Sequence, residues 1–343
     1  MLSTNRSKAP AYETVFAVVA VSGWMQFTGG RLSVTYDQAG QIKEVGVTLR
    51  EMRIEKRQLH METEIIDLHV HSTCSDGTLT PSELVELAVQ KGLKAFALTD
   101  HDCVLGVKEA QDAAKRLGGH LEVIPGVELS CDYNGKEVHV VGLYIDTNQT
   151  YLNQQLEDFC HSRDIRTQEM VERLSDAGLP ISYEALTSAY PESVITRAHI
   201  ARYLVEIGAV KDRSTVFSKY IGDNCPYFVS REKITPQEGI ALIHQTHGLA
   251  FLAHPVLYHM STVTLDTLTA ELAASGLDGI EAVYSTYQPG DEQNIRTLAK
   301  KYGLLISGGS DFHGANKPHI TLGSGTRHMP IPAYLLAEIK SRL

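Results

Sequence analysis

Residues 65–77, with the sequence IIDLHVHSTCSDG, place two histidines and two aspartates within and directly after a short apolar run. Histidine and aspartate are poor strand formers, and neither is stable in a core without a polar partner. Side chains alternate along a strand, so Asp67, His69 and His71 are expected to face the same way. The stretch therefore predicts a strand whose end carries a polar site.

A regular alternation of strands and helices begins at this stretch. Apolar strands are predicted at 65–72, 93–102, 121–130, 136–146, 249–255, 277–285 and 304–313. Helices are predicted between them at 81–92, 104–119, 235–248, about 264–275 and 290–302. Pro81 suits a helix start, and Gly92 and Gly118 suit helix ends. Such a βα rhythm predicts an α/β domain with a parallel sheet, either open or closed into a barrel.

Two segments depart from this rhythm. Residues 150–234 contain amphipathic helix patterns and no convincing strand, which predicts a helical insertion in the α/β domain. Residues 1–64 alternate only loosely, and an Ala-Gly turn within 31–59 predicts one or two β-hairpins. The expected organisation is an N-terminal extension (1–64), a barrel built from 65–149 and 235–343, and a helical insertion (150–234).

Composition restricts the class of protein. The chain has 343 residues, of which 43% are hydrophobic and 21% charged, as in globular proteins. A net charge of −10 argues against a broad DNA-binding surface. Five scattered cysteines favour a reducing cytoplasm, and no apolar run approaches the roughly 20 residues of a membrane span. A signal peptide at 14–27 is the less favoured alternative, because Glu13 intrudes and no clear cleavage site follows.

Further polar residues occur at or near the predicted strand ends. They are His101, Glu128, His139, His254, Asp311 and His313. A single histidine in an apolar strand is more often a hydrogen-bonded core residue than a ligand. Their joint occurrence on successive strands is difficult to attribute to packing, and the carboxyl-end rim of an α/β barrel is where active sites form. We therefore expect these side chains to converge on one cavity.

The residue types indicate the chemistry. Imidazoles and carboxylates without thiolates suit manganese, iron or zinc. Roughly nine candidate ligands exceed what one ion can accept, so two or three ions are expected, and Glu128 could bridge two of them. Closely spaced ions activate water and bind the oxygens of an in-line displacement at phosphorus. The pattern favours metal-assisted hydrolysis of a phosphoester.

The motifs DLHVHSTCSDG, ALTDHD, PGVELS, VHVVGL, FLAHP and GGSDFHG, in this order, resemble the PHP (polymerase and histidinol phosphatase) superfamily from about residue 65 to residue 325. The insertion, with TRAHIARYLVEIG, is similar to the branch that contains the 3′,5′-nucleotide bisphosphate phosphatase and an RNase AM-type 5′-to-3′ exonuclease. The resemblance implies a distorted (β/α)7 PHP barrel with a helical insertion and a trinuclear site, with manganese as the expected metal and iron or zinc as alternatives.

The resemblance also implies metal ligands. They are His69, His71, Asp76, His101, Glu128, His139, His254, Asp311 and His313. One ion would take His69, His71, Glu128 and Asp311, a second Glu128, His139 and His254, and a third Asp76, His101 and His313. The candidate catalytic residues are Asp76, His101, Glu128, His254 and His313. Asp67 and Asp100 are expected behind the ligands, where they would orient the histidines.

For the substrate, Arg197 is the main candidate to bind phosphate, because guanidinium contacts phosphate in a bidentate manner. His199 and Arg163 are further candidates, although Arg163 could instead belong to a solvated helix face. The expected partner is a small phosphorylated nucleotide or a short RNA, and the oligomeric state is left open. The remaining histidines considered, namely His161, His244, His247, His259, His319 and His328, are interpreted as structural or surface residues.

Two alternatives share the barrel. A histidinol-phosphate-type phosphatase would use the same ions, although the insertion with its arginine favours a nucleotide. A non-catalytic PHP binding module would be expected to lack ligands, and none is lost in this sequence. A proofreading exonuclease joined to a DNA polymerase is disfavoured, because the remaining length cannot hold a polymerase.

Overall fold

The structure is a computed structural model that describes residues 30–36, 42–49 and 64–343, except 192, 224 and 231–232. The chain divides into two compact units, Met1–His60 and Met61–Leu343. In the first unit, β1 (Gly30–Tyr36) pairs antiparallel with β2 (Ile42–Leu49). This hairpin lies inside segment 31–59 except for its first residue, whereas the apolar segment 14–27 lies outside the described residues.

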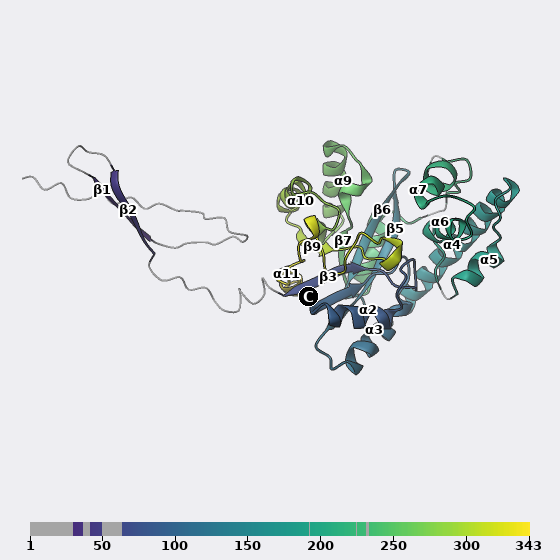
Figure 1. The fold of residues 1–343 in the computed structure, drawn as a ribbon, viewed down its shortest axis with the longest axis horizontal. Coiled ribbons are helices and arrows are strands. Elements are labelled where there is room, and N and C mark those ends of the chain that lie inside the picture. Colours follow the sequence, from purple (N-terminus) through teal and green to yellow (C-terminus); the bar gives the residue numbers. More distant parts are fainter. Residues whose placement is uncertain (1–29, 37–41, 50–63, 192, 224, 231–232) are drawn as a thin grey trace, which may run out of the picture. The chain divides into compact units, whose positions relative to one another are not determined.

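A seven-stranded sheet forms the centre of the second unit (Figure 1). Its strands, in spatial order, are β3 (Ile65–Val70), β4 (Leu93–Leu98), β5 (Glu122–Tyr133), β6 (Lys136–Leu143), β7 (Leu249–Leu252), β8 (Gly279–Tyr284) and β9 (Leu305–Gly309). The two outer strands approach each other, because the Asp311 amide donates to the His69 carbonyl and Val70 bridges to Phe312. The sheet is thus nearly closed, and the predicted α/β barrel is confirmed.

The direction of β6 corrects the prediction of a parallel sheet. Neighbouring strands are parallel except that β6 runs antiparallel to both β5 and β7. Asn134 and Gly135, with φ of 54° and 79°, form a two-residue turn between β5 and β6. Such a turn can only join antiparallel strands, because a parallel connection needs a long crossover. His139 therefore lies in the first half of its strand, and the reversed direction places it beside the carboxyl ends of the parallel strands.

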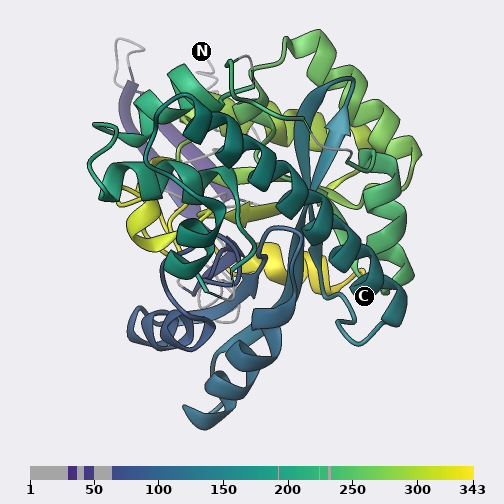
Figure 2. The same ribbon diagram turned by 90° about the vertical axis from the view of Figure 1, so that its right-hand side faces the viewer.

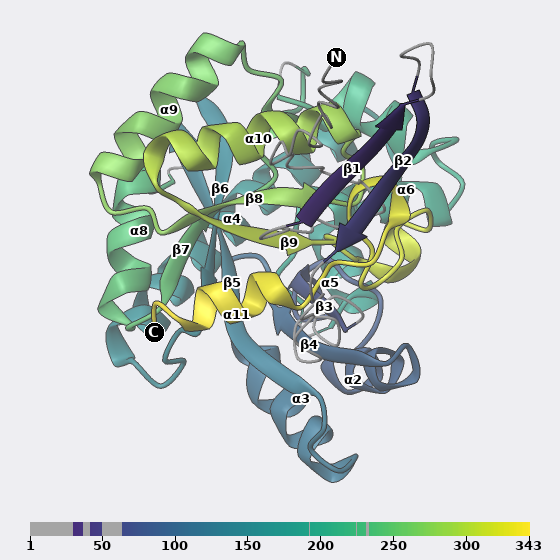
Figure 3. The same cartoon turned by 90° about the vertical axis from the view of Figure 1, so that its left-hand side faces the viewer.

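Helices surround the sheet, as Figure 3 shows for α8 to α11. The helices of the barrel are α2 (Pro81–Gln90), α3 (Leu105–Arg116), α8 (Pro236–Gln245), α9 (Thr262–Ala274), α10 (Pro289–Tyr302) and α11 (Tyr334–Lys340), with short turns η2 (Pro255–Tyr258), η3 (Gly314–Asn316) and η4 (Thr326–His328). Thr80 with Glu83 and Thr235 with Glu238 form capping boxes before α2 and α8, each followed by proline. These caps satisfy the free amides of the first turns and fix where each helix begins.

Residues 150–221 form a separate group of helices, which faces the viewer in Figure 2. It contains α4 (Thr150–Asp176), α5 (Tyr183–Ala189), α6 (Arg197–Glu206), α7 (Arg213–Val216) and a π-helical turn, η1 (Phe217–Ile221). A hydrophobic core of its own, with Met170, Leu174, Leu186, Ile200 and Leu204, holds these helices together. The group is thus packed around its own apolar centre.

Hydrogen bonds attach this helical group to the loops at one end of the barrel. The Ser193 hydroxyl donates to the Thr73 carbonyl at 2.7 Å, and the Val194 amide donates to the Cys74 carbonyl at 3.0 Å. Arg213 donates to Asn316 at 2.7 and 2.8 Å. These bonds bring the group to the loop after β3 and the loop after β9, both of which carry predicted ligands.

Within the described ranges, no helix is both long enough and apolar enough to cross a membrane.

The contacts of β3 predict the effect of removing the first unit. β3 pairs with β4, and the Ile66 amide donates to the Ile331 carbonyl, so the partners of β3 among the described residues belong to Met61–Leu343. We expect a shortened chain beginning at Met61 to fold and to keep most of its turnover. Melting temperature, solubility and phosphatase turnover of both lengths check this. Aggregation of the short chain would show that residues 1–60 cover an apolar surface of the barrel.

Candidate metal centre

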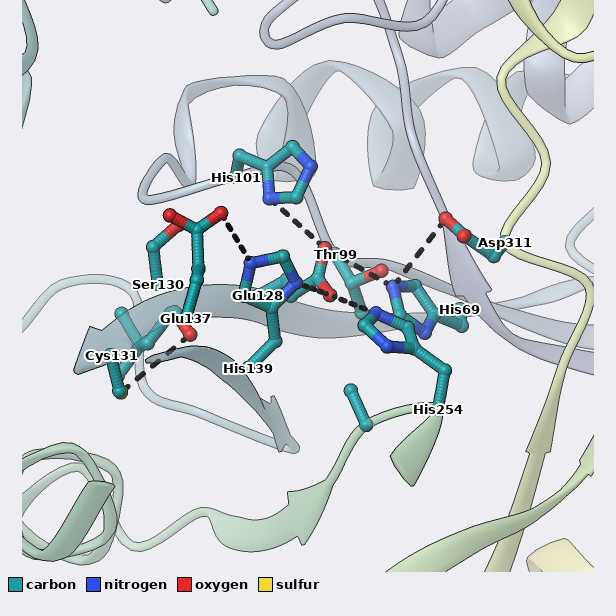
Figure 4. A network of polar contacts seen from close by, with 12 residues as sticks. His69, Thr99, His101, Glu128, Ser130, Cys131, Glu137, His139, His254 and Asp311 are labelled. Carbon is teal, nitrogen blue, oxygen red and sulfur yellow. Dashed lines mark hydrogen bonds and ion pairs between the residues drawn. The ribbon is translucent and has the colours of Figure 1, made fainter. Parts of the chain in front are cut away.

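The Glu128 carboxylate lies at the centre of five imidazole rings, and Figure 4 labels those of His69, His101, His139 and His254 beside it. Two ring nitrogens lie beside Oε1, namely His139 Nδ1 at 2.7 Å and His254 Nε2 at 2.9 Å. Three lie beside Oε2, namely His101 Nδ1 at 3.0 Å, His71 Nε2 at 3.2 Å and His69 Nε2 at 3.3 Å. Glu128 is 1% exposed, so these contacts form away from water. One carboxylate therefore joins residues from five neighbouring strands or their loops.

A second part of the centre surrounds Asp76, which lies in the loop after β3. Its Oδ1 is 3.1 Å from His313 Nε2 and 3.8 Å from both His101 Nε2 and His71 Nδ1. The loop is fixed by its own turns, because the amides of Ser75 and Gly77 both donate to the Ser72 carbonyl. The Thr196 hydroxyl, at the start of α6, donates to Asp76 Oδ2 at 3.3 Å. The helical group thus contacts the centre directly.

Asp311 completes the cluster, and its two carboxylate oxygens face different partners. Oδ1 faces His71 Nε2 at 3.4 Å and His69 Nε2 at 3.8 Å. Oδ2 accepts hydrogen bonds from the Tyr284 hydroxyl and from Lys317 Nζ, both at 2.5 Å. Sequence analysis missed Tyr284 and Lys317. The position of Tyr284 at the carboxyl end of β8 was a signal, since this strand carried no predicted ligand.

Unusual backbone conformations turn several ligands inward. His254 lies shortly after the end of β7, and Asp311 lies shortly after the end of β9. Their φ angles are +25° and +56°. Residues other than glycine rarely adopt positive φ, so packing around the centre must hold these conformations. Gly309 permits the close approach of β9 to β3, because a Cβ there would lie 2.2 Å from the Cβ of His69.

Hydrogen bonds on the outer side of three rings select which nitrogen faces inward. His69 Nδ1 lies 3.2 Å from Glu281, His71 Nδ1 lies 3.4 Å from the Ser75 hydroxyl, and His313 Nδ1 lies 2.8 Å from the Asp311 carbonyl. Each acceptor favours a proton on Nδ1 and leaves Nε2 as an electron-pair donor. Glu281, on β8, was not identified from the sequence.

The expectation that Asp67 and Asp100 orient the histidine rings is wrong in its detail. Asp67 accepts from the amides of Ser310 and Gly323 and from the backbone of His69, so it holds loops rather than a ring. Asp100 accepts from the Ser72 amide and from the hydroxyls of Ser72 and Ser75. Asp100 therefore reaches His71 only through Ser75. Both aspartates hold backbone that carries ligands, which sequence spacing alone cannot distinguish from ring orientation.

Several inward-facing atoms have no hydrogen-bond partner among the described residues. They are His69 Nε2, His71 Nε2, Asp76 Oδ1, His101 Nδ1 and Glu128 Oε2, all buried. Leaving such atoms unsatisfied is costly, and their convergence fits divalent metal ions. Ligand atoms lie within 4.8 Å of one another in three sets, namely His71, Asp76, His101 and His313; His69, His71 and Glu128; and His101, Glu128 and His139. The cluster can therefore bind metal.

The three sets differ in part from the expected division among ions. Glu128 belongs to two sets, as a bridging ligand would. His71 and His101 are also shared, whereas His254 and Asp311 approach the cluster without joining a set. All nine predicted ligands meet in one place, and their division among individual ions stays a prediction.

The predicted substrate residues lie on the helical group. Arg163 is 6% exposed, pairs with Asp102 and donates to the Ser130 hydroxyl at 3.1 Å, so the alternative of a solvated helix face is wrong. Arg197 donates to Asp223 at 2.6 Å and lies 3.6 Å from Glu137.

His199 is buried, and its Nδ1 accepts from the Thr196 amide at 3.0 Å, which caps α6. Its role in substrate binding stays a prediction. The six histidines interpreted as structural or surface residues are all exposed, and of these His244 pairs with Asp278 at 2.8 Å.

Comparison with known proteins agrees with this geometry. A family model described as the PHP domain matches residues 67–196. A 5′-3′ exoribonuclease of Haemophilus influenzae is 38% identical over 251 residues, which cover 73% of this chain and 90% of that protein. A 3′,5′-nucleoside bisphosphate phosphatase of Chromobacterium violaceum is 35% identical over 279 residues, covering 81% of this chain and 97% of that protein. The chain belongs to the PHP family.

A solved structure supports the same assignment. It comes from Bifidobacterium adolescentis and is described as a candidate metal-dependent phosphoesterase. Its TM-score is 0.72 at 30% identity, and the match covers 82% of this chain and 96% of that one. The resemblance to PHP phosphoesterases in the sequence motifs is thereby confirmed, as is the assignment to hydrolases of phosphate ester bonds.

The carboxylates of this PHP centre control the protonation of its histidines. Burial alone would lower the pKa of His71, but Asp311 and Glu128 raise it to about 9. Burial would also lower the pKa of His139, which Glu128 and Glu137 raise to about 10. The pKa of His313 falls to about 4, because burial and the nearby Lys317 disfavour its charged form. At neutral pH, His71 and His139 are therefore protonated and His313 is not.

These pKa values predict how metal affinity depends on pH. A metal requires unprotonated imidazole, so binding near pH 7 should release protons from His71 and His139. We expect affinity to rise as the pH increases toward about 9. Calorimetry in two buffers of different ionisation enthalpy would count the protons released.

The same protons stabilise the metal-free fold. Their contribution is complete below the ordinary histidine pKa of 6.5 and is lost as the pH rises through the pKa of about 9 for His71 and of about 10 for His139. Metal binding that releases no protons at pH 7 would contradict the proposed ligand roles of His71 and His139.

Replacement of the central carboxylate tests the PHP centre itself. In Glu128→Gln a neutral amide replaces the negative charge at the centre of five imidazoles. We therefore expect metal content to fall and turnover to drop by more than roughly 100-fold. Glu122→Gln is a matched control on the same strand, where Glu122 pairs with Lys340 and Tyr144 at the periphery. Metal analysis and phosphatase turnover compare the two, and full turnover by Glu128→Gln would contradict its central role.

Proposed function

We propose that this PHP protein hydrolyses phosphomonoesters of nucleotides, with the 3′-phosphate of a 3′,5′-bisphosphonucleotide as the preferred group to be cleaved. The observation that carries the proposal is a centre of nine imidazole and carboxylate side chains with cationic side chains directly beside it. Arg197 contacts Glu137, and Glu137 in turn contacts His139 of the centre. A substrate with two phosphates fits this pair of neighbouring sites better than a substrate with one.

The names of the relatives support a nucleotide substrate. One is a phosphatase of 3′,5′-nucleoside bisphosphates and another is a 5′-3′ exoribonuclease. Both names describe phosphate esters on a ribose that carries a further phosphate or a further nucleotide. For this chain, hydrolysis of short 5′-phosphorylated RNA from its 5′ end is therefore the second candidate activity.

We propose two or three manganese ions as the cofactor, held by the nine ligands. Divalent ions in such a site act as Lewis acids on the phosphoryl oxygens and activate the attacking water. Glu281, Ser75 and the Asp311 carbonyl hold the histidine rings so that their electron pairs face the centre. Tyr284 and Lys317 fix the Asp311 carboxylate, and Lys317 adds a positive charge near the developing negative charge.

Arg163 and Arg197 supply binding rather than chemistry in this proposal. Guanidinium groups offer paired donors that match phosphate oxygens. Arg163 Nε is buried and has no hydrogen-bond partner among the described residues, so a donor is available there. A phosphate held by these residues would position the second phosphate at the metals and lower the entropic cost of reaction.

The alternatives make different demands on the site. A histidinol-phosphate-type phosphatase binds one phosphate and an amine, so it needs no cationic site for a second phosphate. A non-catalytic binding module would not need all nine ligands to converge. The cytoplasmic location expected from the sequence stays a prediction.

Arg197→Ala tests the substrate class. If Arg197 binds the phosphate that does not react, the variant should raise the KM for adenosine 3′,5′-bisphosphate roughly 10- to 100-fold, as expected for a lost charged hydrogen bond. The KM for p-nitrophenyl phosphate should change little. Arg202→Ala is the matched control on the same helix, where Arg202 pairs with Glu206.

Steady-state kinetics of both variants on both substrates give the answer. Equal losses on the bisphosphate and on the aryl phosphate would show that Arg197 does not contact the second phosphate. Faster turnover of histidinol phosphate than of any nucleotide would favour the small-molecule alternative. Sequential release of mononucleotides from a 5′-phosphorylated RNA would support the exonuclease.

A further inference from the structure

Glu137 lies between the metal centre and two cationic side chains. One is Arg197 of the helical group, and the other is Lys233, in the segment between that group and α8. It lies on β6 two residues before His139, so both side chains point to the same face of the strand. Glu137 Oε1 lies 3.3 Å from His139 Nε2 and 3.6 Å from Arg197 Nη2, while Oε2 pairs with Lys233 Nζ. Figure 4 shows the Glu137 carboxylate beside His139, on the side away from Asp311.

Lys233 places a largely buried ammonium group beside Glu137, which contacts the metal centre. Its side chain is 13% exposed, and the segment that carries it leads from the helical group back to α8. A shielded ammonium group beside a metal-binding centre costs desolvation energy, which a single ion pair repays only in part.

The Glu137 carboxylate occupies a position that suits a phosphate group. It forms ion pairs with a guanidinium and an ammonium at once, and proteins bind phosphate oxygens with the same two cationic groups. Arg197 is also fixed on its other side, by Asp223 at 2.6 Å and by the ring of Phe228, whose centre is 5.3 Å from the guanidinium carbon. The two cations are therefore held in place for an anion that lies next to the metal ligand His139.

We infer that Lys233 binds, together with Arg197, the substrate phosphate that is not hydrolysed. The inference rests on the proposed function and names a specificity-determining residue for it. A phosphate dianion carries more charge than a carboxylate, so it can take over the two cations from Glu137. A ribose with phosphates on its 3′ and 5′ oxygens can then hold one phosphate here and present the other to the metal centre.

Lys233→Gln tests this assignment with two substrates that differ by one group. Adenosine 3′,5′-bisphosphate and adenosine 3′-monophosphate share the scissile phosphate, and only the first has the 5′-phosphate. We expect Lys233→Gln to raise the KM for the bisphosphate roughly 10- to 100-fold and to leave the 3′-monophosphate within about threefold. The kcat should be unchanged on both, and Lys233→Arg should restore most of the affinity.

Lys301→Gln is the control, because Lys301 also pairs with a carboxylate, that of Asp266, but lies exposed on α10. This control should behave like the unmodified protein on both substrates. Equal KM increases for the two substrates in Lys233→Gln, or none on either, would overturn the inference.

A binding measurement separates failure of the inference from failure of the proposed function. Adenosine 5′-monophosphate, which lacks the scissile phosphate, should bind the manganese-loaded protein, and Lys233→Gln should weaken that binding roughly tenfold or more. Unweakened binding overturns the role of Lys233, whatever the turnover. A protein that hydrolyses no phosphate ester but shows the weakened binding would refute the proposed reaction and retain the phosphate subsite.

Discussion

The Glu128 carboxylate and the five imidazoles around it are the interaction on which the rest of this structure depends. A buried carboxylate is unstable unless positive or hydrogen-bonding groups surround it. Here the rings come from the ends of β3, β4 and β7 and from β6, while Glu128 itself lies on β5. Burial would raise the pKa of Glu128, but His139, His101 and His69 hold it well below its usual range. The cluster and the nearly closed sheet therefore require each other.

Residues that hydrogen-bond to the outer sides of the candidate ligands orient them so that they can bind metal. Glu281 and Ser75 determine which nitrogen of His69 and His71 faces inward. Tyr284 and Lys317 hold one oxygen of Asp311 and leave the other for the centre. Outer partners of this kind set ring orientation and ligand basicity, and their loss commonly reduces metal affinity. The positive charges in this part of the protein thus have two separate tasks in our proposal, in which Lys317 supports a ligand and the arginines bind the substrate.

The helical group gives the barrel its second binding element. Thr196 reaches Asp76 in the metal centre, and Arg163 reaches Asp102 in the loop after β4. Arg197 begins α6 inside the group, and Lys233 lies on the segment that returns to α8, so the group and the segment after it each contribute a cation. Because Glu137 joins these cations to His139, the metal centre and the proposed phosphate subsite both border the first half of β6.

Some of this organisation was predictable from local patterns. The periodicity of apolar residues determined where strands and helices occur, since one buried face imposes that spacing. Eight of the nine candidate ligands followed from polar residues at or near strand ends, and Asp76 followed from the resemblance to the PHP family. The reversal of β6 could also have been read from Asn134–Gly135, a pair that favours a two-residue hairpin turn, but the βα rhythm around it favoured a parallel strand.

The sequence by itself determined the elements, the ligand residues and the family, because each depends on residues close together in the chain. Only the tertiary structure decided that Glu281, Tyr284 and Lys317 support the ligands and that Glu137 meets Lys233. Glu281 lies 212 positions from His69, and Lys233 lies 96 positions from Glu137. No local periodicity records such pairs, because they form when the closing sheet and the returning segment bring distant side chains within hydrogen-bond distance.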